Sequence, residues 1–293
     1  KDSGASDGAI KKVFDKKVKM KVFTWKGERD TLLSPLDSIR HYKMFLQTGF
    51  MSMEPQTGYI RAWVGGNDYK YFQYDHVKEG KRQVGSTFKA FLYTLAMQEG
   101  FSPCYKVPNV PVTITDATTG VSWTPTNSDG KYGGMLTLKQ ALAESVNCIS
   151  AYLMKQFGPE AMIQIARKMG ITSTIEPYPS IALGTPDVSV FEMVGAYSTF
   201  ANKGVWVEPQ YLLRIEDKNG VVLQDFVPKK VEAISEETAY LMLSLMKGVV
   251  DYGTSSRLRW KFGLTGAMAG KTGTSQNNSD GWFMGITPEL VSG

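Results

Sequence analysis

The sequence predicts a mixed α/β protein, with one large domain over residues 50–293 and an accessory segment over residues 1–49. Short stretches in which apolar and polar residues alternate are typical of strands. Stretches with apolar residues at helical spacing, behind a serine or threonine cap, are typical of helices. Both kinds follow one another along the chain, and a hydrophobic content of 42% with 21% charged residues indicates a globular protein with a sizeable core.

The composition argues against several classes of function. A net charge of +5 is mild for 293 residues and leaves no patch typical of nucleic-acid-binding proteins. No apolar stretch approaches the roughly 20 residues of a membrane helix. Two histidines and two cysteines give neither metal-ligand spacing nor a disulfide framework. Cys104 and Cys148 could pair, but we favour free, buried thiols.

The accessory segment is expected to lead into the large domain through a linker, a strand and a helix. Residues 1–10 are rich in Gly, Ser and Asp, which is typical of a linker. Residues 17–25 alternate and predict a strand. Ser34 caps a predicted helix that ends at Gly49.

The large domain is expected to begin with a hairpin and to continue with a helix that opens at Ser86 and closes at Gly100. A final strand begins at Val291 and is not completed within the sequence, so we expect a truncated sheet. The other expected elements are helices from residue 137, over 159–169, 189–202 and 235–250, a hairpin over 204–226, and strands over 267–275 and 282–286.

A candidate nucleophile opens the first of these helices. The pattern Ser-x-x-Lys begins at Ser86, Ser128 and Ser244, and its ordinary interpretation is a helix-start serine with a solvated lysine. Ser128 lies among turn formers and Ser244 within an amphipathic helix, whereas Ser86 follows a strand pair and shares a helix face with Lys89. A serine hydroxyl needs a base, and lysine becomes one when burial or a neighbouring cation lowers its pKa. We therefore predict Ser86 as nucleophile and Lys89 as its base.

Ser145 and Asn147 form a second candidate pair. On a regular helix their side chains would point about 200° apart, so they can act together only on a turn between helices. There a serine hydroxyl can relay a proton, and an asparagine amide can hold a peptide group by its donor and its acceptor. The same pattern recurs at Ser275, which also fits an ordinary polar pair.

The segment from Lys271 to Thr274 occurs once and lies on a predicted strand. The pleat puts Thr272 and Thr274 on one face, where two hydroxyls suit a carboxylate. Gly273 leaves room for a ligand backbone, and Lys271 adds a positive charge. The strand edge offers backbone groups to an extended peptide. The plain alternative is an edge strand whose lysine prevents aggregation.

Together and in this order, the three motifs resemble those of the transpeptidase domain of class A (bifunctional) penicillin-binding proteins, a set that β-lactamases share. The resemblance extends from about residue 50 to the end of the sequence. Further segments that carry it are residues 49–51 with 54–55, 82–86, 144–147 and 280–285.

The resemblance implies a five-stranded antiparallel sheet flanked by helices, with a helical part beside it and a cleft between the two. It implies that Ser86 attacks the penultimate D-alanine carbonyl of a peptidoglycan stem peptide, with Lys89 as the base. Ser145 and Lys271 would carry the proton to the leaving amine. The backbone N–H groups of Ser86 and Thr274 would form the oxyanion hole.

The resemblance also implies how substrates and inhibitors bind. Asn147 would hold the substrate amide, and Thr272 and Thr274, on either side of Gly273, its carboxylate. An amine of a neighbouring strand would resolve the acyl-enzyme into a cross-link, and β-lactams would leave Ser86 stably acylated. No metal, organic cofactor or nucleic acid is implied. The full-length protein is expected on the outer, periplasmic face of the bacterial cytoplasmic membrane, anchored in it and carrying an N-terminal glycosyltransferase domain. The acceptor amine, oligomeric state and protein partners stay open.

Three alternatives share these motifs. A β-lactamase usually carries its deacylating glutamate in a Glu-x-x-Leu-Asn loop, and the nearest candidate, residues 176–180, lacks the Leu-Asn pair. A D,D-carboxypeptidase uses water as acceptor and leaves no short motif that tells it apart. A non-catalytic sensor of β-lactams or peptidoglycan would keep the same motifs but turn over slowly.

Overall fold

The computed structural model describes residues 6–115 and 120–293, which divide into two units. The first unit runs to Thr48 and also includes Gly66–Tyr74, and the second comprises Gly49–Gly65 and Asp75–Gly293. The sequence predicts Gly66–Tyr74 to be part of the large domain, whereas the structure groups this segment with the first unit. The loop is polar and aromatic, and its sequence does not show which part of the chain it packs against.

The first unit holds an aromatic cluster around Phe23. The ring centroids of Phe45, Phe72 and Trp25 lie 5.1, 5.3 and 5.4 Å from that of Phe23. Such pairs contribute beyond the area they bury. The elements of this unit are α1 (Asp7–Asp15), β1 (Val18–Thr24), β2 (Gly27–Leu33) and α2 (Pro35–Lys43).

Two expectations for this unit are wrong. The predicted linker over residues 1–10 runs into α1, because the Ser6 hydroxyl accepts the N–H of Ala9 and so caps the helix. The helix expected to reach Gly49 ends at Lys43, and the chain then turns so that Phe45 can pack on the rings of the cluster.

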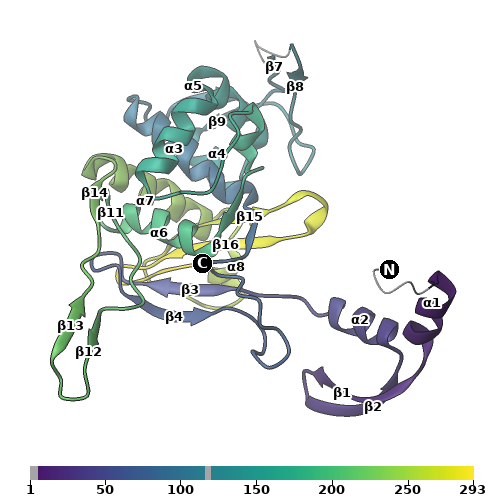
Figure 1. The fold of residues 1–293 in the computed structure, drawn as a ribbon. Coiled ribbons are helices and arrows are strands. Elements are labelled where there is room, and N and C mark those ends of the chain that lie inside the picture. Colours follow the sequence, from purple (N-terminus) through teal and green to yellow (C-terminus); the bar gives the residue numbers. More distant parts are fainter. Residues whose placement is uncertain (1–5, 116–119) are drawn as a thin grey trace. The chain divides into compact units, whose positions relative to one another are not determined.

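The second unit is built on a five-stranded sheet in the order β15-β16-β17-β3-β4, in which every pair is antiparallel (Figure 1). This confirms the predicted sheet. Val291 begins β17, which is the middle strand, because it pairs with Ile286 on one side and Met53 on the other. The strands are β3 (Phe50–Met53), β4 (Ile60–Val64), β15 (Ala269–Thr274), β16 (Gly281–Ile286) and β17 (Val291–Ser292).

Helices α6 and α7 contact this sheet, α3 and α4 pack against α7, and α5 packs against α3. Helix α5 is interrupted at Gly158 (φ 78°, ψ 162°), so the helix expected over residues 159–169 is confirmed as the part after the break. The helical elements are η1 (Gly85–Phe88), α3 (Lys89–Gln98), α4 (Leu138–Ala143), α5 (Asn147–Lys168), η2 (Pro179–Leu183), α6 (Val190–Ala201), α7 (Glu236–Asp251), α8 (Arg257–Trp260) and η3 (Gln276–Asn278).

The remaining strands form two-stranded pairs. The hairpin expected over residues 204–226 is confined to β12 and β13, since β11 pairs with β14 instead. The pairs are β5 (Lys81–Gln83) with β10 (Asp187–Ser189), β6 (Lys106–Pro108) with β9 (Met135–Thr137), β7 (Ile114–Thr115) with β8 (Ser122–Trp123), β11 (Val205–Val207) with β14 (Lys230–Glu232), and β12 (Arg214–Glu216) with β13 (Val222–Asp225).

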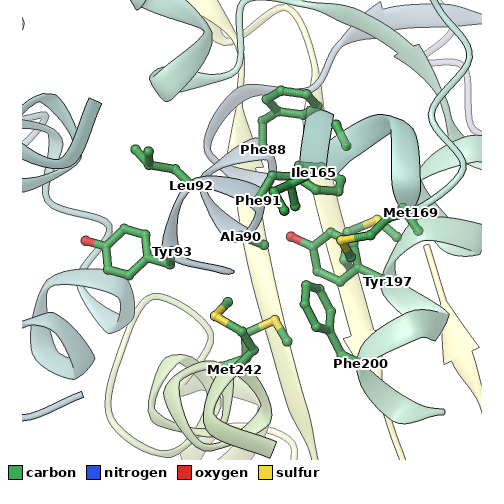
Figure 2. Packing of buried hydrophobic residues seen from close by; sticks show 14 of the residues in the cluster. Phe88, Ala90, Phe91, Leu92, Tyr93, Ile165, Met169, Tyr197, Phe200 and Met242 are labelled. Atoms are coloured by element: carbon green, nitrogen blue, oxygen red, sulfur yellow. The ribbon is translucent and has the colours of Figure 1, made fainter. Parts of the chain in front are cut away.

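Helix α3 runs through the hydrophobic core. Figure 2 shows Phe91 of α3 beside Tyr197 of α6, whose ring centroid lies 5.6 Å from that of Phe200. The Tyr197 hydroxyl, fully buried, donates a hydrogen bond of 2.6 Å to the Thr87 carbonyl oxygen. Because Thr87 follows Ser86, this bond fixes the turn of the candidate nucleophile to the core.

Both cysteines are free, as we favoured, but only Cys148 is buried and Cys104 is exposed. Over residues 6–115 and 120–293, no helix combines the length and the apolar character needed to cross a bilayer.

Candidate active site

Ser86 is held beside the end of β15 by close backbone contacts. It lies in the single turn η1, and Lys89 is the first residue of α3. Gly85 has φ +55°, and a Cβ there would lie 2.5 Å from the Thr274 carbonyl oxygen. The Gly85 N–H donates to the Gly184 carbonyl at 2.9 Å. Only glycine allows the backbone at residue 85 to lie this close to Thr274, so the turn that carries Ser86 packs directly against β15.

The hydroxyl of Ser145 lies between two buried lysines. Lys89 Nζ is 3.3 Å and Lys271 Nζ 3.0 Å from Ser145 Oγ. Lys89 Nζ also donates to the Ser145 carbonyl at 2.7 Å and to Asn147 Oδ1 at 2.6 Å. The structure thus brings together four of the predicted residues from α3, the α4–α5 turn and β15.

Burial lowers the pKa of both lysines. Burial, and then the charge of Lys271, lowers the pKa of Lys89 well below its usual 10.5. Burial lowers the pKa of Lys271 to about 7. Each side chain is fully buried, and its hydrogen bonds go to uncharged oxygens of Ser145, Asn147 and Thr272. A neutral lysine at this position can accept a proton from a hydroxyl.

Ser145 has the turn conformation expected for it. Its φ is +59°, in the left-handed region that costs a non-glycine residue about 1 kcal/mol or more. The strain separates α4 from α5 and turns the Ser145 carbonyl and hydroxyl toward the same lysine.

Asn127 holds the start of α5 and was not recognised from sequence. Its side-chain carbonyl accepts the N–H groups of Asn147 and Cys148, both at 3.0 Å. Its amide donates to Asn109 Oδ1 at 2.8 Å and to the Lys131 carbonyl at 2.7 Å. The residue lies in the run that the sequence showed only as turn formers. Its position behind the helix depends on folding, which local sequence does not reveal.

We expect Asn127→Ala to lower the free energy of unfolding by about 2 kcal/mol, because buried N–H donors lose their acceptor. Urea unfolding measures the loss. Asn202→Ala is the control, since Asn202 makes a single side-chain bond, to the Val205 carbonyl. Equal losses in the two variants would contradict the role given to Asn127.

The three β15 residues from Thr272 to Thr274 have different surroundings. Thr274 lines a cavity with Ser86, whereas the Thr272 hydroxyl lies 2.7 Å from that of Thr254. A side chain at Gly273 would collide with the Val84 carbonyl and with Thr87. The packing of the chain itself therefore requires this glycine. Thr254 carries no motif and was missed.

The cavity beside Ser86 has a volume of about 250 Å³. Asn147, Gly184 and Thr274 are among its walls. Lys89, Lys271 and Ser145 do not line it, but Asn147, which accepts a hydrogen bond from Lys89, does. Within the described residues, no group of three or more His, Cys, Asp and Glu side chains could hold a metal ion.

A serine on a turn at a sheet edge, with two buried lysines sharing a second serine, is typical of enzymes that form serine acyl intermediates. Residues 48–290 match the model of the penicillin binding protein transpeptidase domain, and residues 1–46 that of the penicillin-binding protein middle domain. The chain therefore belongs to the penicillin-binding protein transpeptidase family, and the resemblance to class A members is confirmed.

Individual relatives agree. The chain is 34% identical to penicillin-binding protein 1A of Aquifex aeolicus over 85% of its length and 34% of that protein. Penicillin-binding protein 1A of Haemophilus influenzae superposes with a TM-score of 0.78 at 24% identity, over 84% of this chain and 42% of that one. The PonA1 protein of Mycobacterium tuberculosis in complex with penicillin V gives 0.71 at 23%, over 99% and 78%. The chain spans about a third of the length of the curated relatives it matches.

Proposed function

We propose that this chain is the catalytic part of a peptidoglycan D,D-transpeptidase that works through an acyl-enzyme on Ser86. The observation that carries the proposal is the shared hydrogen bonding of Ser145 Oγ to Lys89 and Lys271, at 3.3 and 3.0 Å. Family membership supports the same reaction class.

In the acylation step, neutral Lys89 takes the proton of the Ser86 hydroxyl. Ser86 Oγ attacks the carbonyl carbon of the penultimate D-alanine, and the oxygen that becomes negative is held by the backbone N–H groups of Ser86 and Thr274. Donors at such an oxyanion hole act on charge that develops in the transition state. The close packing of Gly85 on the Thr274 backbone supports this pairing, because it holds the backbone of the Ser86 turn next to that of Thr274.

The leaving amine then receives its proton through Ser145, from whichever lysine holds it. Asn147 is engaged on both sides of its amide, with Oδ1 bonded to Lys89 and Nδ2 donating to the Thr126 carbonyl at 2.8 Å. One N–H of Asn147 therefore stays available for a substrate carbonyl. Thr274 would bind the terminal carboxylate, with Thr272 oriented beside it by Thr254.

We further propose that β-lactams acylate Ser86. We also propose that the natural protein acts at the outer face of the bacterial cytoplasmic membrane. Finally, we propose that the full-length protein has a membrane anchor and a glycosyltransferase domain. The PonA1 structure with penicillin V supports the first of these. The match of residues 1–46 to the middle domain and the fraction of the relatives' length that is covered support the last.

The test is the intact mass of the protein after incubation with penicillin. We expect one persistent adduct on the peptide that contains Ser86, and none in Ser86→Ala. Ser244→Ala is the matched control, because Ser244 begins another Ser-x-x-Lys pattern, in α7, and should still be acylated.

Rapid hydrolysis of the drug without a lasting adduct would instead favour a β-lactamase. Glu176, its candidate carboxylate, is not among the residues that line the cavity with Ser86. The proposal would be contradicted if the protein formed no adduct and did not hydrolyse the drug.

A further inference from the structure

Two pairs of side-chain contacts tie β5 to the loop between β15 and β16. Arg82 of β5 forms an ion pair with Asp280, in which Nε donates to Oδ1 at 2.7 Å and Nη2 to Oδ2 at 3.3 Å. Beside it, the side-chain oxygen of Gln83 accepts the N–H of Gln276 at 3.1 Å. Strand β5 leads into the turn of the nucleophile, so these contacts join that turn to the loop that follows β15.

Asp280 is bound in turn to the end of β15. Its N–H donates to Ser275 Oγ at 2.7 Å, and its carbonyl oxygen accepts the Ser275 N–H at 3.1 Å. The Ser275 hydroxyl also donates to Asp280 Oδ2 at 3.0 Å. Thr274, the preceding residue, pairs with Gly281 in the sheet. A displacement of Asp280 should therefore move the backbone of Thr274 with it.

The other end of the ion pair is fixed close to the nucleophile. Arg82 pairs with Val188 of β10. Further along, the Gly85 N–H donates to the Gly184 carbonyl at 2.9 Å. Because the short stretch from Arg82 to Ser86 is held at both of these points, a change at Arg82 is transmitted to the turn of the nucleophile.

We propose that Arg82 and Asp280 are positioning residues, whose ion pair sets the distance between the backbone N–H groups of Ser86 and Thr274. The inference rests on the proposed function, in which these two groups form the oxyanion hole. The packing of Gly85 on Thr274 limits how closely the two segments approach, and the ion pair opposes their separation. The two donors belong to segments distant in sequence, so their spacing depends on such tertiary contacts.

An arginine is well suited to this role. Its planar guanidinium binds a carboxylate through two parallel hydrogen bonds, which fix orientation as well as distance. The Arg82 side chain is 59% exposed, and ion pairs of this kind contribute little to the stability of a fold. The effect of the pair should therefore appear in the rate of the reaction rather than in the melting temperature.

Acylation by penicillin, followed by stopped flow at several drug concentrations, tests the proposal. This measurement separates the rate constant of acylation from the dissociation constant of the complex that precedes it. We expect Arg82→Gln and Asp280→Asn each to lower the rate constant roughly tenfold, less than the loss of about 10²-fold or more when an oxyanion donor is removed outright. The dissociation constant should stay the same. The double variant should be no slower than the slower single variant, because both changes remove the same contact.

The infrared spectrum of the acyl-enzyme gives a second and more direct measurement. Hydrogen bonds to a carbonyl oxygen lower its stretching frequency, and isotope labelling of the penicillin carbonyl identifies the ester band. In Arg82→Gln and Asp280→Asn this band should move to higher frequency than in the wild type. A residue that only stabilised the fold would change the fraction of protein that is acylated and leave the frequency as it is.

Arg61→Gln and Glu54→Gln are the matched controls. Arg61 Nη2 lies 2.6 Å from Glu54 Oε1, and the Arg61 side chain is 54% exposed, much like that of Arg82. This pair joins β4 to the residue after β3, and β4 is the edge strand opposite β15. Both control variants should be acylated at the rate of the wild type.

Rate constants and carbonyl bands like those of the wild type would overturn the role given to the ion pair. Effects that add up in the double variant, or a change in the dissociation constant alone, would overturn it as well. A wild-type protein that forms no acyl-enzyme would instead remove the proposed function, so the two failures are distinguishable.

Discussion

Replacing Lys89 by Met should lower the rate of acylation by penicillin about 10³-fold, within the range measured for the loss of a general base. The side chain is fully buried and its pKa is lowered by burial and then by Lys271, so it is the group best suited to take the proton of Ser86. Methionine fills a similar volume without a buried amine, so the melting temperature should not fall. Stopped-flow acylation measures the rate.

The pH dependence gives the sharper result. In the wild type, acylation should accelerate as the pH rises through the pKa of Lys89, because only the neutral amine accepts a proton. In Lys271→Met the residual rate should rise at higher pH than in the wild type, since the charge that lowers the pKa of Lys89 is gone. A profile that stays in place, or moves to lower pH, would contradict the coupling of the two lysines.

Replacing Glu192 by Gln should cost about 3 kcal/mol of unfolding free energy at neutral pH. The carboxylate accepts hydrogen bonds from Ser173 Oγ and Ser189 Oγ at 2.7 and 2.8 Å, and from the N–H groups of Thr172 and Ser173 at 2.8 and 2.7 Å. Burial raises the pKa of Glu192, but the hydrogen bonds from Ser173 and Ser189 outweigh it and lower the pKa from 4.5 to about 2. Each pKa unit corresponds to about 1.4 kcal/mol.

The sign of the effect follows from proton binding. The unfolded chain binds the proton more tightly, so the contribution of Glu192 is complete above pH 4.5 and is lost as the pH falls toward 2. Wild type and Glu192→Gln should therefore converge in stability in acid. Glu232→Gln, an exposed exchange on β14, is the control. A difference between wild type and Glu192→Gln that stays constant from pH 7 to 2.5 would refute the assignment.

The elements that sequence predicted well are those with strong local patterns. Helices were expected to start at residues 137 and 189, and capping boxes at Thr137 and Ser189 begin α4 and α6. The helix α1 was missed because its single signal, Ser6 before Asp7, lies in a run that is otherwise typical of a linker. The return of Gly66–Tyr74 to the first unit has no local signal at all.

The contacts of the candidate site also fall into those that local sequence predicts and those that it does not. Ser86 and Lys89 are near neighbours, so their proximity could be predicted from helical geometry. The contact of Ser145 with Lys271 joins residues 126 positions apart, and only the order of the motifs suggested it. Asn127 and Thr254 act through hydrogen bonds to residues at least 18 positions away, such as Asn147 and Thr272. Residue type alone does not distinguish such side chains from those of ordinary turn residues.

The middle position of β17 has a consequence for folding. Ser52 of β3 contacts Ser292 of β17 across 240 positions of sequence, so the sheet joins its two hairpins only through a pairing of very high sequence separation. Closing so long a loop costs entropy before any contact compensates for it, and folding rates fall as the mean separation of contacts grows. Until that pairing forms, β3 and β17 each expose an unpaired edge that can join another chain. Refolding should therefore be slow and sensitive to protein concentration.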